Sequence, residues 1–207
     1  MIRAFVALSL PGQAVWQLEG AQAGLPVGRA VPPENFHITL AFLGEIRTTV
    51  LEDVHSALSA IRAPAFSVGL NGVDVFGGRQ PTSLHATVTA DPGLDHLQAK
   101  VVQASRQAGV TPKAGRYTPH VTLARFGKGM SGEDAARLRA FVSGRLSFRV
   151  APFEVGGFTL FRSRLGKRPH YDALAHYTLV TGSAGGRDTP GDTPAETWEA
   201  GRFSAGW

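Results

Sequence analysis

Two histidine–threonine pairs are the residues of this sequence whose types and spacing could do chemistry. His37 and Thr39 lie in the string F-H-I-T-L-A-F-L-G, and His120 and Thr122 lie in P-H-V-T-L-A-R-F-G, 83 positions later. If each string is a strand, the histidine and threonine of a pair point to the same face, because side chains alternate along a strand. Two such faces that meet across a cleft would bring two imidazoles and two hydroxyls together.

These side chains suit in-line displacement at a phosphodiester, such as a ribose cyclic phosphate. One histidine can take a proton from an attacking water or hydroxyl while the other donates a proton to the leaving oxygen. Two threonine hydroxyls can hydrogen-bond the non-bridging oxygens of a phosphate held between them. The reaction needs an acid and a base on opposite sides of phosphorus, and these groups supply both without a metal or another cofactor.

A metal site is the alternative use of the histidines, and the sequence argues against it. Neither nine-residue string contains an Asp or a Glu. The spacings of the other histidines match no metal-ligand signature. These histidines are His55, His85, His96, His170 and His176. We therefore predict that the site contains no metal and no cofactor.

Apolar patterns predict the elements that must position the two strings, in the same order in each half. Alternating or continuous apolar runs predict strands, and apolar residues three and four apart predict helices. In the first half the predicted elements are a strand at 2–10, a helix at 13–23, the motif strand at 36–43, a helix from 48 to 61, and two strands within 66–76 joined by an Asn71-Gly72 turn. In the second half they are a strand at 84–88, a helix at 92–109, the second motif strand, a helix after Ser131 that runs to 142, and strands between 148 and 158, followed by a last strand at 177–181.

The repeated order predicts an internal duplication, with repeats at about 1–80 and 81–164. The expected fold is α+β and two-lobed: two antiparallel sheets flanked by helices, with a central cleft between them. We predict one bilobal domain over residues 1–182. From 183 to 207, Gly, Pro, Thr, Ser and Asp dominate, which predicts a flexible low-complexity tail.

Composition sets the expected surroundings of the protein. The chain has 207 residues, a formal net charge of +5 and no cysteine, so disulfides and thiolate chemistry are excluded and polyanionic partners are favoured. The apolar start is too short to span a membrane, and Pro11-Gly12 leads into a helical pattern instead of a cleavage site. We expect a cytoplasmic monomer that does not bind membranes.

The paired motifs resemble those of a known family. The strings H-I-T-L and H-V-T-L look like the paired HxTx motifs of the 2H phosphoesterase superfamily. The longer strings N-F-H-I-T-L-A-F-L-G-E and P-H-V-T-L-A-R-F, with the R-S-R-L segment and Tyr171, are most similar to its bacterial branch, the RNA 2′,3′-cyclic phosphodiesterases, also called 2′-5′ RNA ligases. The resemblance spans about residues 1–181.

The resemblance implies an activity and roles for individual residues. It implies hydrolysis of a 2′,3′-cyclic phosphate at an RNA end to a 2′-phosphate, with the reverse 2′-5′ ligation as a weak side activity. It also implies that His37 is the proton donor and His120 the proton acceptor, and that Phe42 and Arg125 hold the terminal nucleotide. Simple strand alternation puts Phe42 and Arg125 on the face opposite the histidines, so they reach the cleft only if each strand bulges or ends just before them.

Two other functions stay open at this point. The same chemistry could act on a small cyclic nucleotide or on an ADP-ribose cyclic phosphate, where base stacking on Phe42 would matter less. A non-catalytic RNA-end binding module could keep the cleft and the basic surface. Binding needs no histidine, so His37→Ala or His120→Ala should stop an enzyme and leave a binding module intact.

Overall fold

The computed structural model describes residues 1–113, 115–166 and 169–180. Over these residues the chain forms the predicted α+β fold, with four α-helices and nine strands. The helices are α1 (Gly12–Gln22), α2 (Thr48–Ser59), α3 (Pro92–Gln107) and α4 (Gly132–Ser143), with a 3-10 turn, η1 (Pro33–Asn35). The strands are β1 (Ile2–Ser9), β2 (Arg29–Ala30), β3 (His37–Ile46), β4 (Phe66–Phe76), β5 (Ser83–Val88), β6 (His120–Arg125), β7 (Arg149–Val155), β8 (Gly157–Arg164) and β9 (His170–Thr178).

The strands pair in the order β7-β4-β5-β6-β3-β1-β8-β9, and the short β2 pairs with β6. All of these pairs are antiparallel. At the centre of this order, β3 and β6 pair at one position only, where Ile38 lies opposite Val121. Both side chains are fully buried. The two predicted sheets are therefore two groups of strands that join at a single residue pair.

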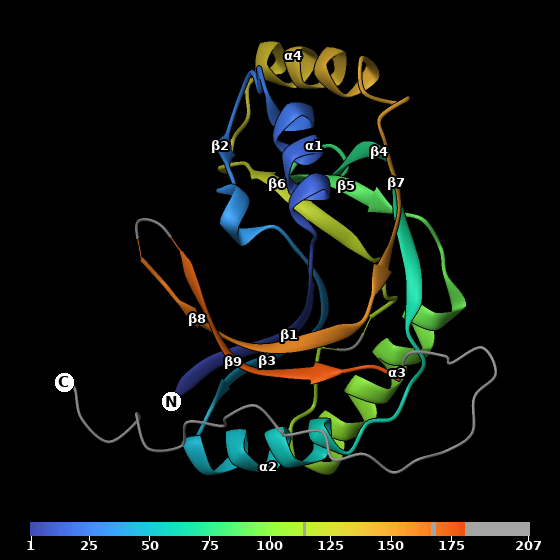
Figure 1. The fold of residues 1–207 in the computed structure, drawn as a ribbon. Helices are drawn as coiled ribbons and strands as arrows, with labels where there is room; N and C mark the ends of the chain where they lie inside the picture. The colour runs from blue at the N-terminus through green and yellow to red at the C-terminus, as the bar shows by residue number, and fades with distance from the viewer. Residues whose placement is uncertain (114, 167–168, 181–207) are drawn as a thin grey trace.

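Helices cover the outer side of each group of strands. We call β1, β3, β8 and β9 the first lobe and β4, β5, β6 and β7 the second lobe. Helices α2 and α3 pack against each other and against β9 and β3 of the first lobe, whereas α1 packs against β6 of the second lobe. Figure 1 shows α2 and α3 at one end of the molecule and α1 and α4 at the other, with the strands between them.

Each lobe contains strands from both halves of the sequence. The first-half strand β4 lies in the second lobe between β5 and β7, and the second-half strand β8 lies in the first lobe beside β1. The chain thus crosses between the lobes, so the sequence halves do not map one to one onto them. The predicted duplication stays a prediction, and the predicted domain limit at 182 and the tail 183–207 lie outside the described residues.

The hairpin expected at Asn71-Gly72 does not form, because residues 66–76 make the single strand β4. Gly72 has a φ of 78°, in the left-handed region that glycine adopts without a steric penalty. The register between β4 and β5 shifts between Leu70 and Val73, so the glycine lies in a β-bulge. β4 pairs with β5 along one edge and with β7 along the other. Its residues therefore pair with these two strands and not with each other across a turn.

The predicted helical patterns are confirmed by the residues that they bury. α2 buries Leu51, Val54 and Leu58, whose spacings of three and four residues place them on one face. α3 buries Leu94 and Leu97 in the same way, together with further residues along its length. These faces complete the core of the first lobe behind β3 and hold that strand in place.

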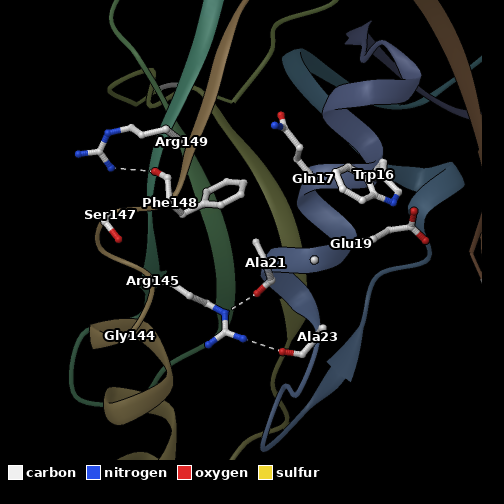
Figure 2. Close-up of a pocket in the computed structure, with 11 residues that line it drawn as sticks. Trp16, Gln17, Glu19, Ala21, Ala23, Gly144, Arg145, Ser147, Phe148 and Arg149 are labelled. Atoms are coloured by element: carbon white, nitrogen blue, oxygen red, sulfur yellow. Dashed lines mark hydrogen bonds between the residues drawn. The ribbon is translucent and has the colours of Figure 1, made fainter.

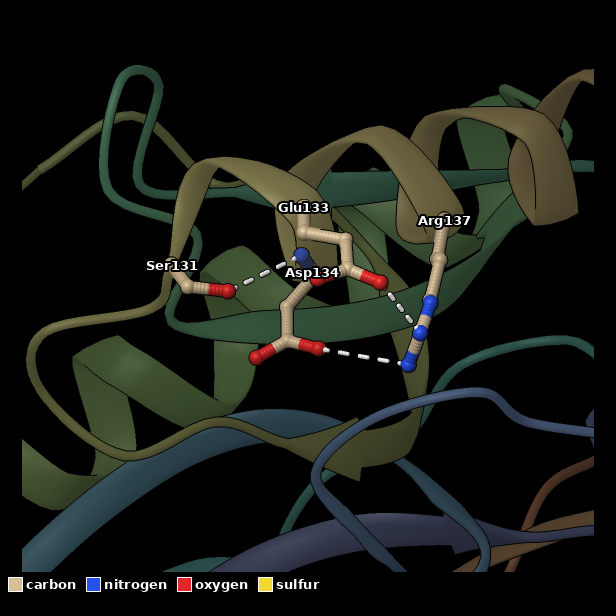
Figure 3. Close-up of polar contacts among 4 residues, drawn as sticks. All are labelled: Ser131, Glu133, Asp134 and Arg137. Carbon is tan, nitrogen blue, oxygen red and sulfur yellow. Dashed lines mark hydrogen bonds and ion pairs between the residues drawn. The ribbon is translucent and has the colours of Figure 1, made fainter.

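Helix α4 begins after the predicted cap. The Ser131 hydroxyl accepts a hydrogen bond from the backbone N–H of Asp134 at 3.0 Å. Glu133 and Asp134 lie in the first turn, where the helix dipole favours negative charge, and Arg137 pairs with both carboxylates, as Figure 3 shows. A capping hydroxyl of this kind contributes about 1 kcal/mol to stability. The start of α4 is therefore fixed by its own sequence.

Candidate active site

A β-bulge interrupts the alternation of side chains in the first motif strand. Along the β1–β3 pair, Ala7 lies opposite Thr39, but the next residue, Val6, lies opposite Ala41. Leu40 is therefore the extra residue of a bulge, and both Leu40 and Ala41 are buried.

The second motif strand has the same bulge at the same place. Along the β5–β6 pair, His85 lies opposite Thr122, but Leu84 lies opposite Ala124, which leaves Leu123 as the extra residue. Leu123 and Ala124 are both fully buried. In this register His85 takes the place opposite the motif threonine that Ala7 takes in the first strand pair.

The bulges return Phe42 and Arg125 to the same face as the histidines. Phe42 lies opposite Phe5, and Arg125 lies opposite Ser83. The Phe42 side chain is 55% exposed, which is unusual for a large apolar residue within a strand. The strands thus have the bulges that Phe42 and Arg125 need in order to reach the cleft. Both side chains are available to a ligand beside the histidines.

The six predicted site residues line one cavity, which we call the central cavity. Its volume is about 400 Å³, and both lobes contribute to its wall. The six are His37, Thr39, Phe42, His120, Thr122 and Arg125. Since Ile38 and Val121 are paired, the antiparallel register brings His37 beside Thr122 and Thr39 beside His120.

The two histidines are held by the same backbone contact. Nδ1–H of His37 donates to the carbonyl of Asn35 at 2.8 Å, and Nδ1–H of His120 donates to the carbonyl of Thr118 at 2.7 Å. A carbonyl can only accept, so Nδ1 carries the proton of each neutral ring. Nε2 of each ring is then left to accept or donate a proton in the central cavity.

Aromatic rings surround His37. Phe5 lies at 4.9 Å between ring centroids, and Tyr171 meets the imidazole edge-on at 5.3 Å. The Asn35 side chain donates to the carbonyl of Pro169 at 2.8 Å, which ties the approach to His37 to the β8–β9 connection. Tyr171 thus packs against His37 and also lines the central cavity. The sequence did not point to Asn35, because its partner is distant along the chain.

A third histidine, His85, packs against His120. Its ring stacks on Phe76 at 3.9 Å and meets His120 edge-on at 5.4 Å. His85 is 3% exposed, and its Nδ1 has no hydrogen-bond partner among the described residues. Sequence reasoning missed this contact, because it depends on the register that sets His85 opposite Thr122.

Burial keeps the histidines of this region neutral. Burial lowers the pKa of His37 to about 4, although the hydrogen bond to Asn35 opposes it, and the charges of His120 and Arg125 lower that pKa further. Burial also lowers the pKa of His120, against its hydrogen bond to Thr118, and Arg125 adds to the lowering. A bound phosphate would raise both pKa values, since an anion favours imidazolium. Both rings are therefore neutral in the empty site at neutral pH, and a bound phosphate would favour their protonation.

A larger cavity, of about 980 Å³, lies between α1 and the segment after α4 and shares no lining residue with the central cavity. Figure 2 shows that Arg145 donates there to the carbonyls of Ala21 and Ala23, at 2.7 and 2.6 Å. The Arg149 guanidinium likewise donates to the carbonyls of Leu146 and Phe148. The arginines of this cavity thus hold the backbone in place, and the cavity lacks a proton-transfer pair. The smaller central cavity is the better candidate site.

Within the described residues, no three His, Cys, Asp or Glu side chains are grouped so that they could hold a metal ion. No helix in this part of the chain is long and apolar enough to cross a membrane.

The lowered histidine pKa predicts a loss of stability in weak acid. Because the pKa of His37 is about 4 when folded and 6.5 when unfolded, the unfolded chain binds more protons between these values, and the free energy of unfolding falls as the pH falls. In urea unfolding at pH 7 and pH 5, we expect His37→Asn to lose less stability than the wild type, by about 2 kcal/mol. An equal loss in both proteins would contradict the burial of a neutral His37.

Comparison with known proteins places the chain in a family. A family model described as the 2′-5′ RNA ligase superfamily matches residues 13–167. Two proteins named RNA 2′,3′-cyclic phosphodiesterase, from Geobacillus stearothermophilus and Bacillus subtilis strain 168, are each 30% identical to the chain. The similarity covers 90% of the chain but 60% of the Geobacillus protein, and 84% of the chain and 95% of the Bacillus protein.

Solved structures share the fold. Escherichia coli LigT complexed with 3′-AMP has a TM-score of 0.69 at 23% identity, over 86% of the chain and 98% of LigT. The protein TT0787 of Thermus thermophilus has a TM-score of 0.70 at 26% identity, with the same coverage. The family model and the Bacillus relative confirm the resemblance of the paired motifs to 2H phosphoesterases: the chain belongs to the 2′-5′ RNA ligase superfamily.

Proposed function

We propose that the protein is an RNA 2′,3′-cyclic phosphodiesterase, which opens the cyclic phosphate at an RNA end to a 2′-phosphate. The observation that carries this proposal is the convergence of two His–Thr pairs on one cavity, each histidine with Nε2 left free by the same backbone contact. The names of the two 30% identical relatives support the choice of substrate. The reverse 2′-5′ ligation follows as a weak side activity, since the same groups serve both directions.

The reaction requires one proton transfer on each side of phosphorus. Nε2 of His120 takes a proton from water as the water oxygen bonds to phosphorus. The bond between phosphorus and O3′ breaks, and the imidazolium form of His37, which the bound phosphate favours, gives its Nε2 proton to O3′, which leaves the phosphate on O2′. One water is consumed, and the proton gained by His120 and the proton lost by His37 are re-equilibrated with solvent. The mechanism needs no metal ion, because the side chains themselves supply the acid and the base.

The remaining site residues hold the substrate in this geometry. The Thr39 and Thr122 hydroxyls donate hydrogen bonds to the non-bridging oxygens, where charge must be stabilised in the transition state. The exposed Phe42 ring offers a stacking surface to the terminal base, and the Arg125 guanidinium supplies positive charge for a phosphate or a base edge. The bulges support these roles, because they put both side chains in the central cavity.

The proposal is tested with an oligonucleotide that ends in a 2′,3′-cyclic phosphate, in the presence of EDTA. We expect the wild type to convert it to a 2′-phosphate end, identified by mass spectrometry and phosphorus NMR. His37→Ala and His120→Ala should each lower kcat by about a hundredfold or more, because general acid–base catalysis contributes 10²–10⁴-fold. His96→Ala, at an exposed histidine of α3, is the control and should retain activity.

Several outcomes would reject parts of the proposal. Persistence of the cyclic end at high enzyme concentration would reject hydrolysis, and unchanged RNA affinity in both alanine variants would then favour a binding module. Loss of turnover on chelation would reject the metal-free mechanism. A faster reaction on small cyclic nucleotides or ADP-ribose cyclic phosphate than on RNA would change the substrate class. The cytoplasmic location and the monomeric state stay predictions from the sequence.

The separate roles of the two histidines are tested with an RNA end in which sulfur replaces the bridging 3′ oxygen. A thiolate leaves without being protonated, so the acid becomes dispensable. We expect His37→Ala to be much less impaired on the sulfur substrate than on the oxygen substrate, whereas His120→Ala should be impaired on both. The measurement is kcat/KM of each variant on the two substrates. If the sulfur substrate rescued His120→Ala and not His37→Ala, then His120 would be the acid and His37 the base.

A further inference from the structure

A second cavity adjoins the central cavity and shares part of its wall. This cavity, the loop pocket, has a volume of about 360 Å³ and shares Thr39, Phe42 and His120 with the central cavity. Phe42 therefore forms part of the boundary between two spaces of similar size. A ligand that passes this boundary would extend from the histidines directly into the loop pocket.

The loop pocket combines an apolar floor with a basic rim. Apolar and aromatic side chains from β3, β4 and α3 form the floor, among them Leu40, Phe76 and Val102. Lys113 and Arg116 lie on the segment between α3 and β6 and are exposed to solvent. Neither cation forms an ion pair within the described part of the chain. The loop pocket therefore suits a ligand with a flat apolar group and a negative charge.

Two side chains that line the loop pocket hydrogen-bond the backbone of the first motif strand. The Tyr117 hydroxyl donates to the carbonyl of Thr39 at 3.1 Å, and the Gln98 side chain donates to the carbonyl of Leu40 at 3.4 Å. Burial, with a smaller effect from Asp95, raises the pKa of Tyr117, so its hydroxyl remains a donor at neutral pH. The rim of the loop pocket is therefore tied to the strand that carries His37 and Thr39.

An RNA substrate needs a place for the nucleotide before its cyclic end. The terminal ribose must lie in the central cavity, because its phosphate has to reach both histidines. The chain continues from the O5′ atom of that ribose, so the preceding nucleotide must occupy an adjoining space. The small cavity of about 40 Å³ beside His37 and Thr122 cannot hold a nucleoside, and a cavity of about 540 Å³ shares only Pro169 with the central cavity. The loop pocket shares three residues with the central cavity and is large enough for a nucleoside.

We propose that the loop pocket is the subsite for the nucleotide that precedes the cyclic end. Its base packs on the apolar floor, and Lys113 and Arg116 neutralise the phosphate that links it to the terminal nucleotide. This inference rests on the proposed function, and it makes the enzyme selective for RNA chains over mononucleotides. A mononucleoside cyclic phosphate fills only the central cavity and gains nothing from the basic rim.

The experiment compares two substrates that differ by one nucleotide: adenosine 2′,3′-cyclic phosphate and the dinucleotide ApA with a 2′,3′-cyclic phosphate. We expect the wild type to favour the dinucleotide by about tenfold or more in kcat/KM, since hydrogen bonds to a charged group are among the stronger ones. In the double variant Lys113→Gln/Arg116→Gln, the ratio of the two values should fall about tenfold. The charge-matched control Arg47→Gln/Arg139→Gln changes exposed arginines outside both cavities and should keep the wild-type ratio.

Salt dependence gives a second, independent readout. Each phosphate contact in single-stranded RNA adds about 0.7 to the slope of log affinity against log salt concentration. For dinucleotide binding, the slope of log affinity against log salt concentration should be shallower in the double variant than in the wild type by about 0.7. The control variant should keep the wild-type slope.

Two results would overturn the subsite. They are equal wild-type kcat/KM for the two substrates, and a wild-type ratio retained in the double variant, whether or not both values fall. Hydrolysis of adenosine 2′,3′-cyclic phosphate by the wild type separates these failures from failure of the proposed function, in which neither substrate would be cleaved.

Discussion

The pair formed by Ile38 and Val121 is the constraint on which the site depends. It is the single position at which β3 and β6 are paired, and it lies at the centre of the strand order of the two lobes. Because both side chains are buried, their neighbours along each strand must face the other way, toward the central cavity. One buried pair thus fixes the approach of the two motif strands. A wider separation of the lobes would move His37 and His120, the proposed acid and base, apart.

The bulges after the two threonines add Phe42 and Arg125 to the face that carries the histidines. An unbroken strand would turn Arg125 to the face of Val121 and Leu123, where an unpaired guanidinium would be costly to bury. The bulge at Leu123 avoids that cost and returns the charge to the central cavity. Burial lowers the pKa of both histidines, and the charge of Arg125 adds a smaller lowering. A bound phosphate would raise both pKa values, since an anion favours imidazolium.

The sequence could predict features that depend on local residue spacing, such as which side chains share a face of a strand or helix. The shared face of His37 and Thr39 follows from strand alternation, and the buried face of α2 follows from helical spacing. The contact of His85 with His120 could not be predicted, because it depends on register between strands that are distant in sequence. The bulge was signalled by Arg125, since a charged side chain at a position expected to be buried argues against unbroken alternation. The exchange of β4 and β8 between lobes is a matter of topology, and no local pattern encodes it.

The most direct test of the account is a nitrogen-15 NMR titration of the histidine rings, with and without adenosine 2′-monophosphate as the phosphate ligand. In the free protein at neutral pH, His37 and His120 should both be neutral with the proton on Nδ1, as their carbonyl partners require. On binding, the Nε2 resonances of both rings should shift together, and both pKa values should rise, because one phosphate lies between them. A response from one ring alone, or a neutral ring protonated on Nε2, would contradict a shared two-histidine site.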